Sequence, residues 1–299
     1  MLYRLRHLTA YAYRNPVGYA RCTLRLAPAA GEGQVPLSHE VVVEPAPRTA
    51  TERGDFFGNR TVSLTVETPH RDFRIDAQSR VRVERPPLPD RDSGPAWEEV
   101  RERVLTRPGL DPDAPAHFTA PSRRVPLLPE VTDYARASFP PGGGAYAGAF
   151  DLMRRIRADF AFDAEATEVG TPLAQAFAGR RGVCQDFSHI MIAALRGLGL
   201  PAAYVSGYLR TLPPPGQPRL EGADASHAWV AVWCGAGWLG LDPTNGVAVR
   251  DDHIVVARGR DYGDVAPVDG IVSGSGKQRL KVEVDVIPDT ETQDLALVG

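Results

Sequence analysis

The period of the hydrophobic pattern changes between the two halves of the chain, and this change limits the folds that the chain can adopt. Up to about residue 85, apolar and polar residues alternate in short runs, for example over residues 21–26 and 61–67. A period of two predicts short strands with one buried face, as in a β-sandwich or an open barrel. After residue 144, apolar residues recur every three or four positions, which predicts helices. We therefore expect an α+β protein that begins with a β-sandwich-like domain.

The length of 299 residues is enough for two domains of about 150 residues each. We expect a β-rich N-terminal domain over residues 1–85, a proline-rich linker over residues 86–130 and a second domain over residues 131–299. The linker contains ten prolines. Because proline fixes φ, this connection is expected to be stiff.

Within the second domain the pattern predicts individual elements. Helices are expected over about residues 146–160 and 184–198, the latter with a buried apolar stripe. The alternating pattern then predicts strands over residues 203–209, 228–233, 238–241 and 279–287, the middle two forming a hairpin. The loop over residues 211–223 carries three consecutive prolines and is a candidate rim or lid of the site.

Composition excludes several classes of protein. Lys and Arg number 34 against 37 Asp and Glu, a net charge of −3, so no basic field attracts nucleic acid. No apolar run suits a membrane helix or a secretory signal, so we expect a cytoplasmic protein without membrane contact. The three cysteines are an odd number, which predicts at least one free thiol and argues against a disulfide framework.

Cys184 is the candidate nucleophile. It follows Gly182 and Val183 at the predicted start of the second helix. Unpaired N–H groups and the positive dipole end of a helix favour a thiolate, the form of cysteine that attacks carbonyl carbon. The alternative is an inert apolar core residue, which is the commoner role of a cysteine.

His227 and Asp242 are the candidate partners of this thiol. A thiolate nucleophile needs a base within hydrogen-bonding reach and an acceptor that orients the base. If Trp233 pairs with Trp238 in the predicted hairpin, Asp242 falls opposite Trp229, about 7 Å diagonally from His227 on one face. The order Cys, His, Asp is then the layout of a papain-like thiol site.

Several segments carry a more specific resemblance. The N-terminal residues 7–13 (HLTAYAY) are similar to the β-rich region that precedes the core in one bacterial family. The other segments resemble the core of that family, the bacterial transglutaminase-like superfamily, in order and spacing: residues 182–189 (GVCQDFSH), 199–208 (GLPAAYVSGY), 226–229 (SHAW), 242–245 (DPTN) and 259–262 (GRDY). One departure is Ala203, where many relatives carry arginine.

The resemblance implies a papain-like core, with a helix packed on an antiparallel sheet, that extends over residues 131–299. It implies that Cys184 is the nucleophile, His227 the general base and acid, and Asp242 the residue that orients His227. The chemistry would pass through a thioester that water or an amine resolves. The backbone N–H of Cys184, at a helix start, is the natural first oxyanion donor. The departure at Ala203 leaves this triad intact.

Other residues near these motifs are candidates for shaping the site: Gln185, Asp186, Trp229 and Asn245. Gln185 and Asp186 serve equally well as a structural cap of the helix start. Trp229 also fits the core of the hairpin. His189 is interpreted as a packed or hydrogen-bonded histidine rather than a second base, because it lies about a turn and a half beyond Cys184.

No metal and no cofactor are predicted. Cys184, His189, His227 and Cys234 could supply four zinc ligands, but their spacings lack the close pairs of structural zinc sites. No Asp-x-Asp-x-Asp-Gly loop suggests calcium binding.

The favoured function is a thiol-dependent peptidase or amidase that acts on a peptide or protein substrate. One alternative is an amine-transferring or deamidating transglutaminase, because the same three residues serve both outcomes. Another is a non-catalytic binding or scaffold protein that keeps the fold. The sequence leaves the physiological substrate, the role of the N-terminal domain and the oligomeric state open.

Overall fold

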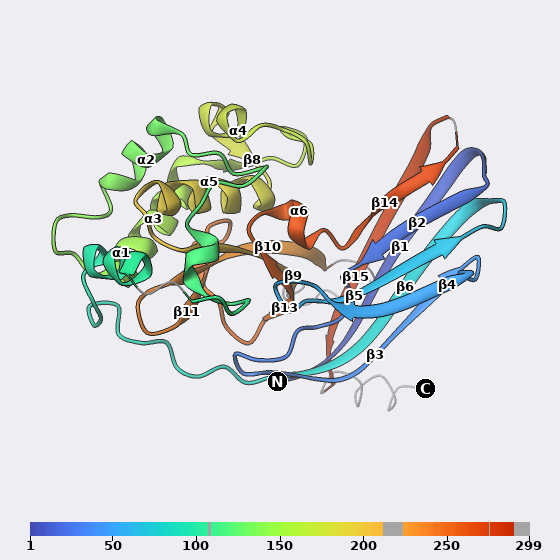
Figure 1. The fold of residues 1–299 in the computed structure, drawn as a ribbon, viewed down its shortest axis with the longest axis horizontal. Coiled ribbons are helices and arrows are strands. Elements are labelled where there is room, and N and C mark those ends of the chain that lie inside the picture. The colour runs from blue at the N-terminus through green and yellow to red at the C-terminus, as the bar shows by residue number, and fades with distance from the viewer. Residues whose placement is uncertain (107–108, 212–223, 275, 290–299) are drawn as a thin grey trace, which may run out of the picture.

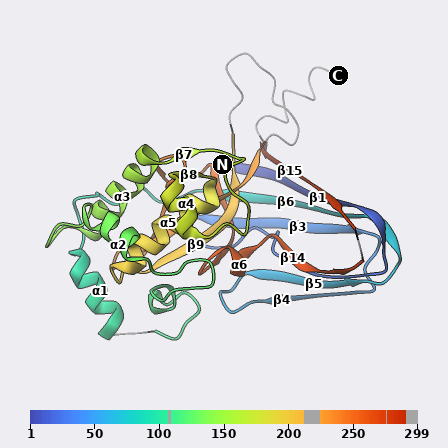
Figure 2. The ribbon, with the colours of Figure 1, turned by 90° about the horizontal axis from the view of Figure 1, so that it is seen from above.

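The computed structural model describes residues 1–106, 109–211, 224–274 and 276–289, and it has two lobes. One lobe contains the helices and a five-stranded sheet, and the other contains two four-stranded sheets (Figure 1). The view from above shows the two lobes side by side along the long axis (Figure 2). This is the mixed α+β fold that the two hydrophobic periods predict.

The all-β lobe is a sandwich of antiparallel sheets. Its strands are ordered β15-β1-β6-β3 in one sheet and β14-β2-β5-β4 in the other. Buried Leu24 and Leu64 from the second sheet pack in one cluster with Phe73 and Ile75 from the first, so the two sheets meet face to face. The strands are β1 (Leu2–Val17), β2 (Tyr19–Leu24), β3 (Gln34–Glu44), β4 (Thr49–Gly54), β5 (Arg60–Val66), β6 (His70–Val83), β14 (Val268–Ser273) and β15 (Gln278–Pro288).

The last two strands correct the predicted domain division. β14 pairs with β2, and β15 pairs with β1 over eleven residues from Tyr3↔Pro288 to Tyr13↔Gln278. Residues 268–288 thus complete the sandwich instead of belonging to a core domain over residues 131–299. Alternation along 279–287 predicts a strand but contains no information about which sheet the strand joins.

The helical lobe is built on a sheet of order β12-β11-β10-β9-β13. Its strands are β9 (Ala202–Leu209), β10 (Ala225–Trp233), β11 (Trp238–Asp242), β12 (Val247–Ala248) and β13 (His253–Gly259), and a separate parallel pair is formed by β7 (Ala161–Phe162) and β8 (Arg181–Gly182). The helices are α1 (Trp97–Thr106), the 3₁₀ helix η1 (Pro115–Phe118), α2 (Pro129–Arg136), α3 (Ala145–Asp159), α4 (Leu173–Gly179), α5 (Cys184–Gly197) and α6 (Tyr262–Val265).

Helix α5 is the centre of this lobe. Twelve of its residues are buried, and it packs against β9 and β10. The surrounding core includes Tyr3 of β1, Val83 of β6 and Val286 of β15, so the two lobes share one apolar core. The sheet on which α5 packs is therefore itself connected to the sandwich, through contacts of β15 with β9 and β10.

The predicted linker is a packed segment. Between residues 86 and 130 the chain forms α1 and η1, and Val100, Val104 and Phe118 are buried there. The predicted hairpin has the expected register, since Trp233 pairs with Trp238. Of the candidate lid over residues 211–223, residues 212–223 lie outside the described part of the chain. Among the described helices, none combines the length and the apolarity needed to cross a bilayer.

Candidate functional site

Cys184 is the first residue of α5. The Asp186 carboxylate accepts a hydrogen bond from the Val183 N–H at 2.9 Å and another from the Thr167 hydroxyl at 2.5 Å. These bonds connect Val183, the residue before α5, and Thr167, in the preceding loop, to the first turn of the helix. A Cβ on Gly182 would lie 2.5 Å from the Asp186 Oδ2, so only glycine fits this approach. The position of the Cys184 backbone is therefore strongly determined.

His227 of β10 and Asp242 of β11 form a buried pair. The distance from His227 Nε2 to Asp242 Oδ2 is 2.8 Å, and the side chains are 8% and 0% exposed. This contact follows from the hairpin register, as the sequence predicts. Burial disfavours the imidazolium, but hydrogen bonds with Asp242 and Cys184 outweigh it and raise the pKa of His227 to about 10. The structure thus brings the three predicted residues together.

Five donors surround the Asp242 carboxylate. Its Oδ1 accepts from the backbone N–H groups of Thr244 at 2.9 Å and Asn245 at 3.1 Å. Its Oδ2 accepts from Asn245 Nδ2 at 2.7 Å, in addition to His227 and a second histidine, His253, at 3.3 Å. Burial alone would raise the pKa of Asp242, but the hydrogen bonds from His227, His253 and Asn245 lower it. The group is therefore a stable carboxylate.

His253 is the residue that the sequence reasoning missed. It begins β13, is 1% exposed, and its Nδ1 lies 2.6 Å from the Asp252 Oδ1. β13 pairs with β9 at the edge of the sheet, and no local pattern specifies that pairing. The available signal was a histidine directly after two aspartates at the start of an apolar run.

The other candidate residues occupy different places. The Trp229 ring lies beside both histidines, with ring centroids 6.2 Å from His227 and 5.3 Å from His253. Asn245 binds Asp242, as described above. Gln185 Nε2 donates to the Val169 carbonyl at 3.2 Å, and so connects α5 to the preceding loop.

His189 is part of the packed interior. Its Nε2 accepts from the Tyr262 N–H at 3.2 Å, and its ring lies 5.0 Å from that of Tyr204. Burial lowers the pKa of His189 to about 3, which keeps the ring neutral. This agrees with the interpretation of His189 as a hydrogen-bonded core residue.

The three cysteines are free thiols in different surroundings. Burial raises the pKa of Cys22 to about 11 and that of Cys234 to about 12, whereas Cys184 is partly exposed. Among the described residues, ligand-type atoms of His227, Asp242 and His253 form a trio within 4.8 Å of one another, which is a different set from the four residues considered from the sequence. Hydrogen bonds already connect all three of its members.

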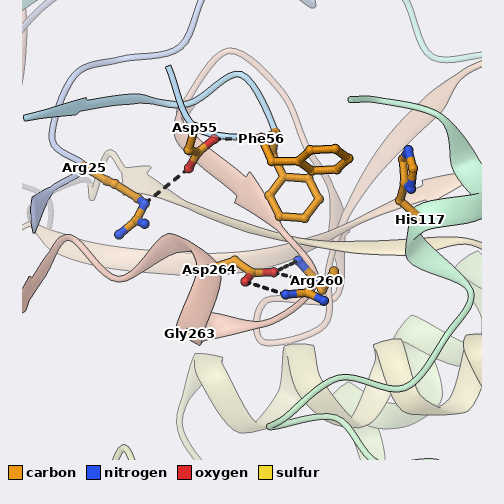
Figure 3. Close-up of a pocket in the computed structure, with 8 residues that line it drawn as sticks. Arg25, Asp55, Phe56, His117, Arg260, Gly263 and Asp264 are labelled. Carbon is orange, nitrogen blue, oxygen red and sulfur yellow. Dashed lines mark hydrogen bonds and ion pairs between the residues drawn. The ribbon is translucent and has the colours of Figure 1, made fainter. Parts of the chain in front are cut away.

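The described residues form several cavities outside this site, and two of them bear on ligand binding. One, of about 480 Å³, is lined by Phe56, His117 and two ion pairs, Arg25–Asp55 at 3.4 Å and Arg260–Asp264 at 2.9 Å (Figure 3). Each cation there already faces a carboxylate, so the cavity does not favour a charged ligand. The other, of about 700 Å³, includes Trp229 in its lining. Neither cavity is lined by Cys184, His227 or Asp242.

Comparison with protein families gives two matches. The bacterial transglutaminase-like N-terminal region matches residues 3–82, and the transglutaminase-like superfamily matches residues 135–243. The second match includes Cys184, His227 and Asp242. The first covers β1 to β6 but stops before the two strands that complete the sandwich.

Individual proteins are similar over nearly the whole chain. An uncharacterized protein of Mycobacterium tuberculosis is 39% identical, covering 96% of this chain and 92% of its own. An uncharacterized protein of Mycobacterium leprae is 31% identical, covering 95% and 97%. The crystal structure of a "Putative Cysteine Protease" from Cytophaga hutchinsonii has a TM-score of 0.74 at 21% identity, covering 96% of this chain and 91% of that chain. At that identity the match demonstrates a shared fold.

Proposed function

The chain belongs to the transglutaminase-like superfamily, and from this membership we propose that it catalyses thiol-dependent acyl transfer on amide bonds of peptides or proteins. The observation that carries the proposal is the buried His227–Asp242 pair, hydrogen-bonded at 2.8 Å and coupled to the Cys184 thiol at the start of α5. Cys184 is proposed as the nucleophile, His227 as the acid and base, and Asp242 as the residue that holds His227.

In the proposed cycle the Cys184 thiolate attacks the amide carbonyl carbon and forms a C–S bond. His227, as the imidazolium, gives its proton to the leaving amine as the C–N bond breaks, and a thioester remains on Cys184. Water, deprotonated by His227, then attacks the thioester. The C–S bond breaks, the acyl group leaves as a carboxylic acid, and Cys184 returns to the thiolate beside the His227 imidazolium. A primary amine in place of water would give the transferase outcome.

The start of α5 supplies a donor for the oxyanion of the tetrahedral intermediate. The Cys184 N–H is among the first N–H groups of the helix, which have no partner within it. A donor fixed before the reaction stabilises developing negative charge without reorganisation. Asp186 contributes indirectly, because it holds the backbone that enters the helix.

The pH dependence of alkylation by iodoacetamide tests the thiol pair. In the wild-type protein, Cys184 should react with a midpoint well below the free thiol value of about 8.5. His227→Ala should return the midpoint to that value. Cys22 and Cys234 should stay unmodified in this range, because burial raises their pKa values to about 11 and about 12. A midpoint near 8.5 in both proteins would favour the scaffold alternative.

A peptide-amide assay with and without a primary amine separates hydrolysis from transfer. We expect acid release whose rate does not depend on the amine, and no amine-linked product. Cys184→Ala is the control and should abolish turnover. An amine-linked product as the main species would assign the protein to the transferase alternative.

A further inference from the structure

His253 lies between two carboxylates. Its Nε2 is 3.3 Å from the Asp242 Oδ2, and its Nδ1 is 2.6 Å from the Asp252 Oδ1. The histidine side chain is 2% exposed and that of Asp242 is fully buried, whereas Asp252 is half exposed. The ring is further held by Trp229, which meets it edge-on at 5.3 Å between centroids.

Hydrogen-bond chemistry fixes the charge of this ring. A neutral imidazole has one N–H donor and one lone pair, whereas an ionised carboxylate only accepts. Asp242 is ionised, because the groups around it, including Thr244 N–H and Asn245 Nδ2, donate to it. A neutral ring would direct a lone pair at either Asp242 or Asp252. Both contacts are satisfied together only when His253 carries two N–H donors.

We propose that His253 is a positioning residue of the thiol site, held as an imidazolium between Asp242 and Asp252 so that Asp242 is fixed and part of its charge is neutralised. The inference rests on the proposed function, because its effect on the reaction passes through Asp242 and His227. His253 does not touch the reacting atoms. Its role is to set the orientation of Asp242 and the strength with which Asp242 holds the His227 proton.

The effect of His253 on the His227 proton follows from the positive charge of the His253 ring. The rings of His227 and His253 are 6.3 Å apart between centroids and share the Asp242 Oδ2. A cation at His253 opposes protonation of His227, so the imidazolium of His227 releases its proton to a leaving amine more readily. Without this cation, Asp242 would bind the His227 proton more tightly.

The charged groups around His253 come from several elements. Asp242 is at the end of β11, His227 is on β10, and Asp252 precedes the histidine. Arg85 donates to the His253 carbonyl at 3.0 Å and to the Arg250 carbonyl at 3.1 Å. The side chains of Asp242 and Asp252 stabilise the charged ring through hydrogen bonds and raise the pKa of His253, although burial opposes this.

Nitrogen NMR of the histidine-labelled wild-type protein tests the charge without any substitution. At pH 7 both ring nitrogens of His253 should have the shifts of protonated imidazolium nitrogens, assigned by the signals that disappear in His253→Gln. A non-protonated ring nitrogen at His253 would overturn the proposal. This measurement does not depend on turnover, so it tests the charge of His253 separately from the proposed function.

Two variants separate the effect of His253 on the position of Asp242 from the effect of its positive charge on His227. His253→Gln removes the cation and the double contact, so kcat should fall at least about tenfold while KM stays within about twofold. The alkaline limb of the kcat/KM profile should also move up by about one pH unit, because His227 holds its proton more tightly. Asp252→Asn leaves a neutral ring that still donates to Asp242. It should therefore show the same shift with most of kcat retained.

His39→Gln is the matched control. His39 is on β3 in the sandwich, bound to the Ser79 hydroxyl at 2.8 Å, and its replacement should change neither kcat nor the pH profile. Thermal melting of each variant reports folding. An active wild type with an unchanged limb in folded His253→Gln and Asp252→Asn would disprove the role of His253. A wild type with no turnover and an ordinary thiol would instead disprove the proposed function.

Discussion

At the scale of single residues, the site shows which contacts a sequence makes predictable. His227 and Asp242 lie on neighbouring arms of one hairpin, so counting along the arms places them together. His253 reaches the same carboxylate from a strand whose neighbour is β9, and no local count gives that pairing. Local register is encoded in short segments, whereas sheet order depends on the packing of the whole molecule.

The buried histidines outside the site predict how stability depends on pH. Burial lowers the pKa of His7 to about 4 and that of His189 to about 3. In the unfolded chain both titrate near 6.5, so the unfolded state binds more protons below that pH. The free energy of unfolding should therefore fall as pH falls from about 6.5 towards 4, by about 1.4 kcal/mol per pH unit for each residue.

Urea unfolding between pH 5 and 6 measures this slope. His227, with its pKa raised to about 10, is protonated in both states over that window and adds no slope. Its own contribution to stability is present below about pH 6.5 and is lost as pH rises towards 10. His189→Gln should have a clearly smaller slope than the wild type. An equal slope in the two proteins would show that His189 does not stay neutral.

At the scale of elements, the hydrophobic pattern predicts where helices and strands occur, but it does not predict which strands pair with one another in a sheet. The helix expected at 184–198 is α5, and the hairpin has its expected pairing. The strand predicted at 279–287 is present, but its place in the second domain was wrong, because a period of two defines a buried face and not a neighbouring strand. The linker was predicted from its prolines, yet its few apolar residues pack as α1 and η1.

The entry to α5 gives a prediction at this scale. Gly182→Ala would bring a Cβ to 2.5 Å from the Asp186 carboxylate, displace that side chain from the Val183 N–H and move the backbone of Cys184. We expect a loss of about 1–2 kcal/mol in the free energy of unfolding and a fall in kcat of about tenfold or more.

Gly179→Ala, at the end of α4, is the matched control for this substitution. The nearest atom to a Cβ there is Arg181 Cγ at 4.0 Å, an ordinary contact. Chemical denaturation and steady-state kinetics compare the two variants. Equal behaviour of the two alanine variants would contradict the role given to Asp186.

At the scale of the whole molecule, the two lobes are one structure. β15 covers β1 along eleven pairs, and its Val284 and Val286 belong to the core around α5. Asp224, just before β10, donates its backbone N–H to the Val284 carbonyl at 3.1 Å. The sandwich and the site are therefore stabilised by common contacts.

Truncation of the chain after residue 266 tests whether the helical lobe depends on the last two strands of the sandwich. Loss of β14 and β15 leaves β1 and β2 with unpaired edges and removes Val284 and Val286 from the core. We expect the shortened protein to be largely unfolded at 25 °C by circular dichroism, with no fast-reacting thiol. A cooperative melting transition like that of the full chain would show that the catalytic lobe and the first six strands suffice.

The return of the chain to the sandwich has a consequence for biosynthesis. β1 to β6 lack two neighbouring strands until residue 288 has been made, while the helices and strands that carry the thiol site are complete by residue 265. Folding during translation usually proceeds from the N-terminus. Here neither lobe has its full core before β15 has been made, because Val284 and Val286 belong to the core around α5, so the two lobes are expected to fold together and late rather than one after the other.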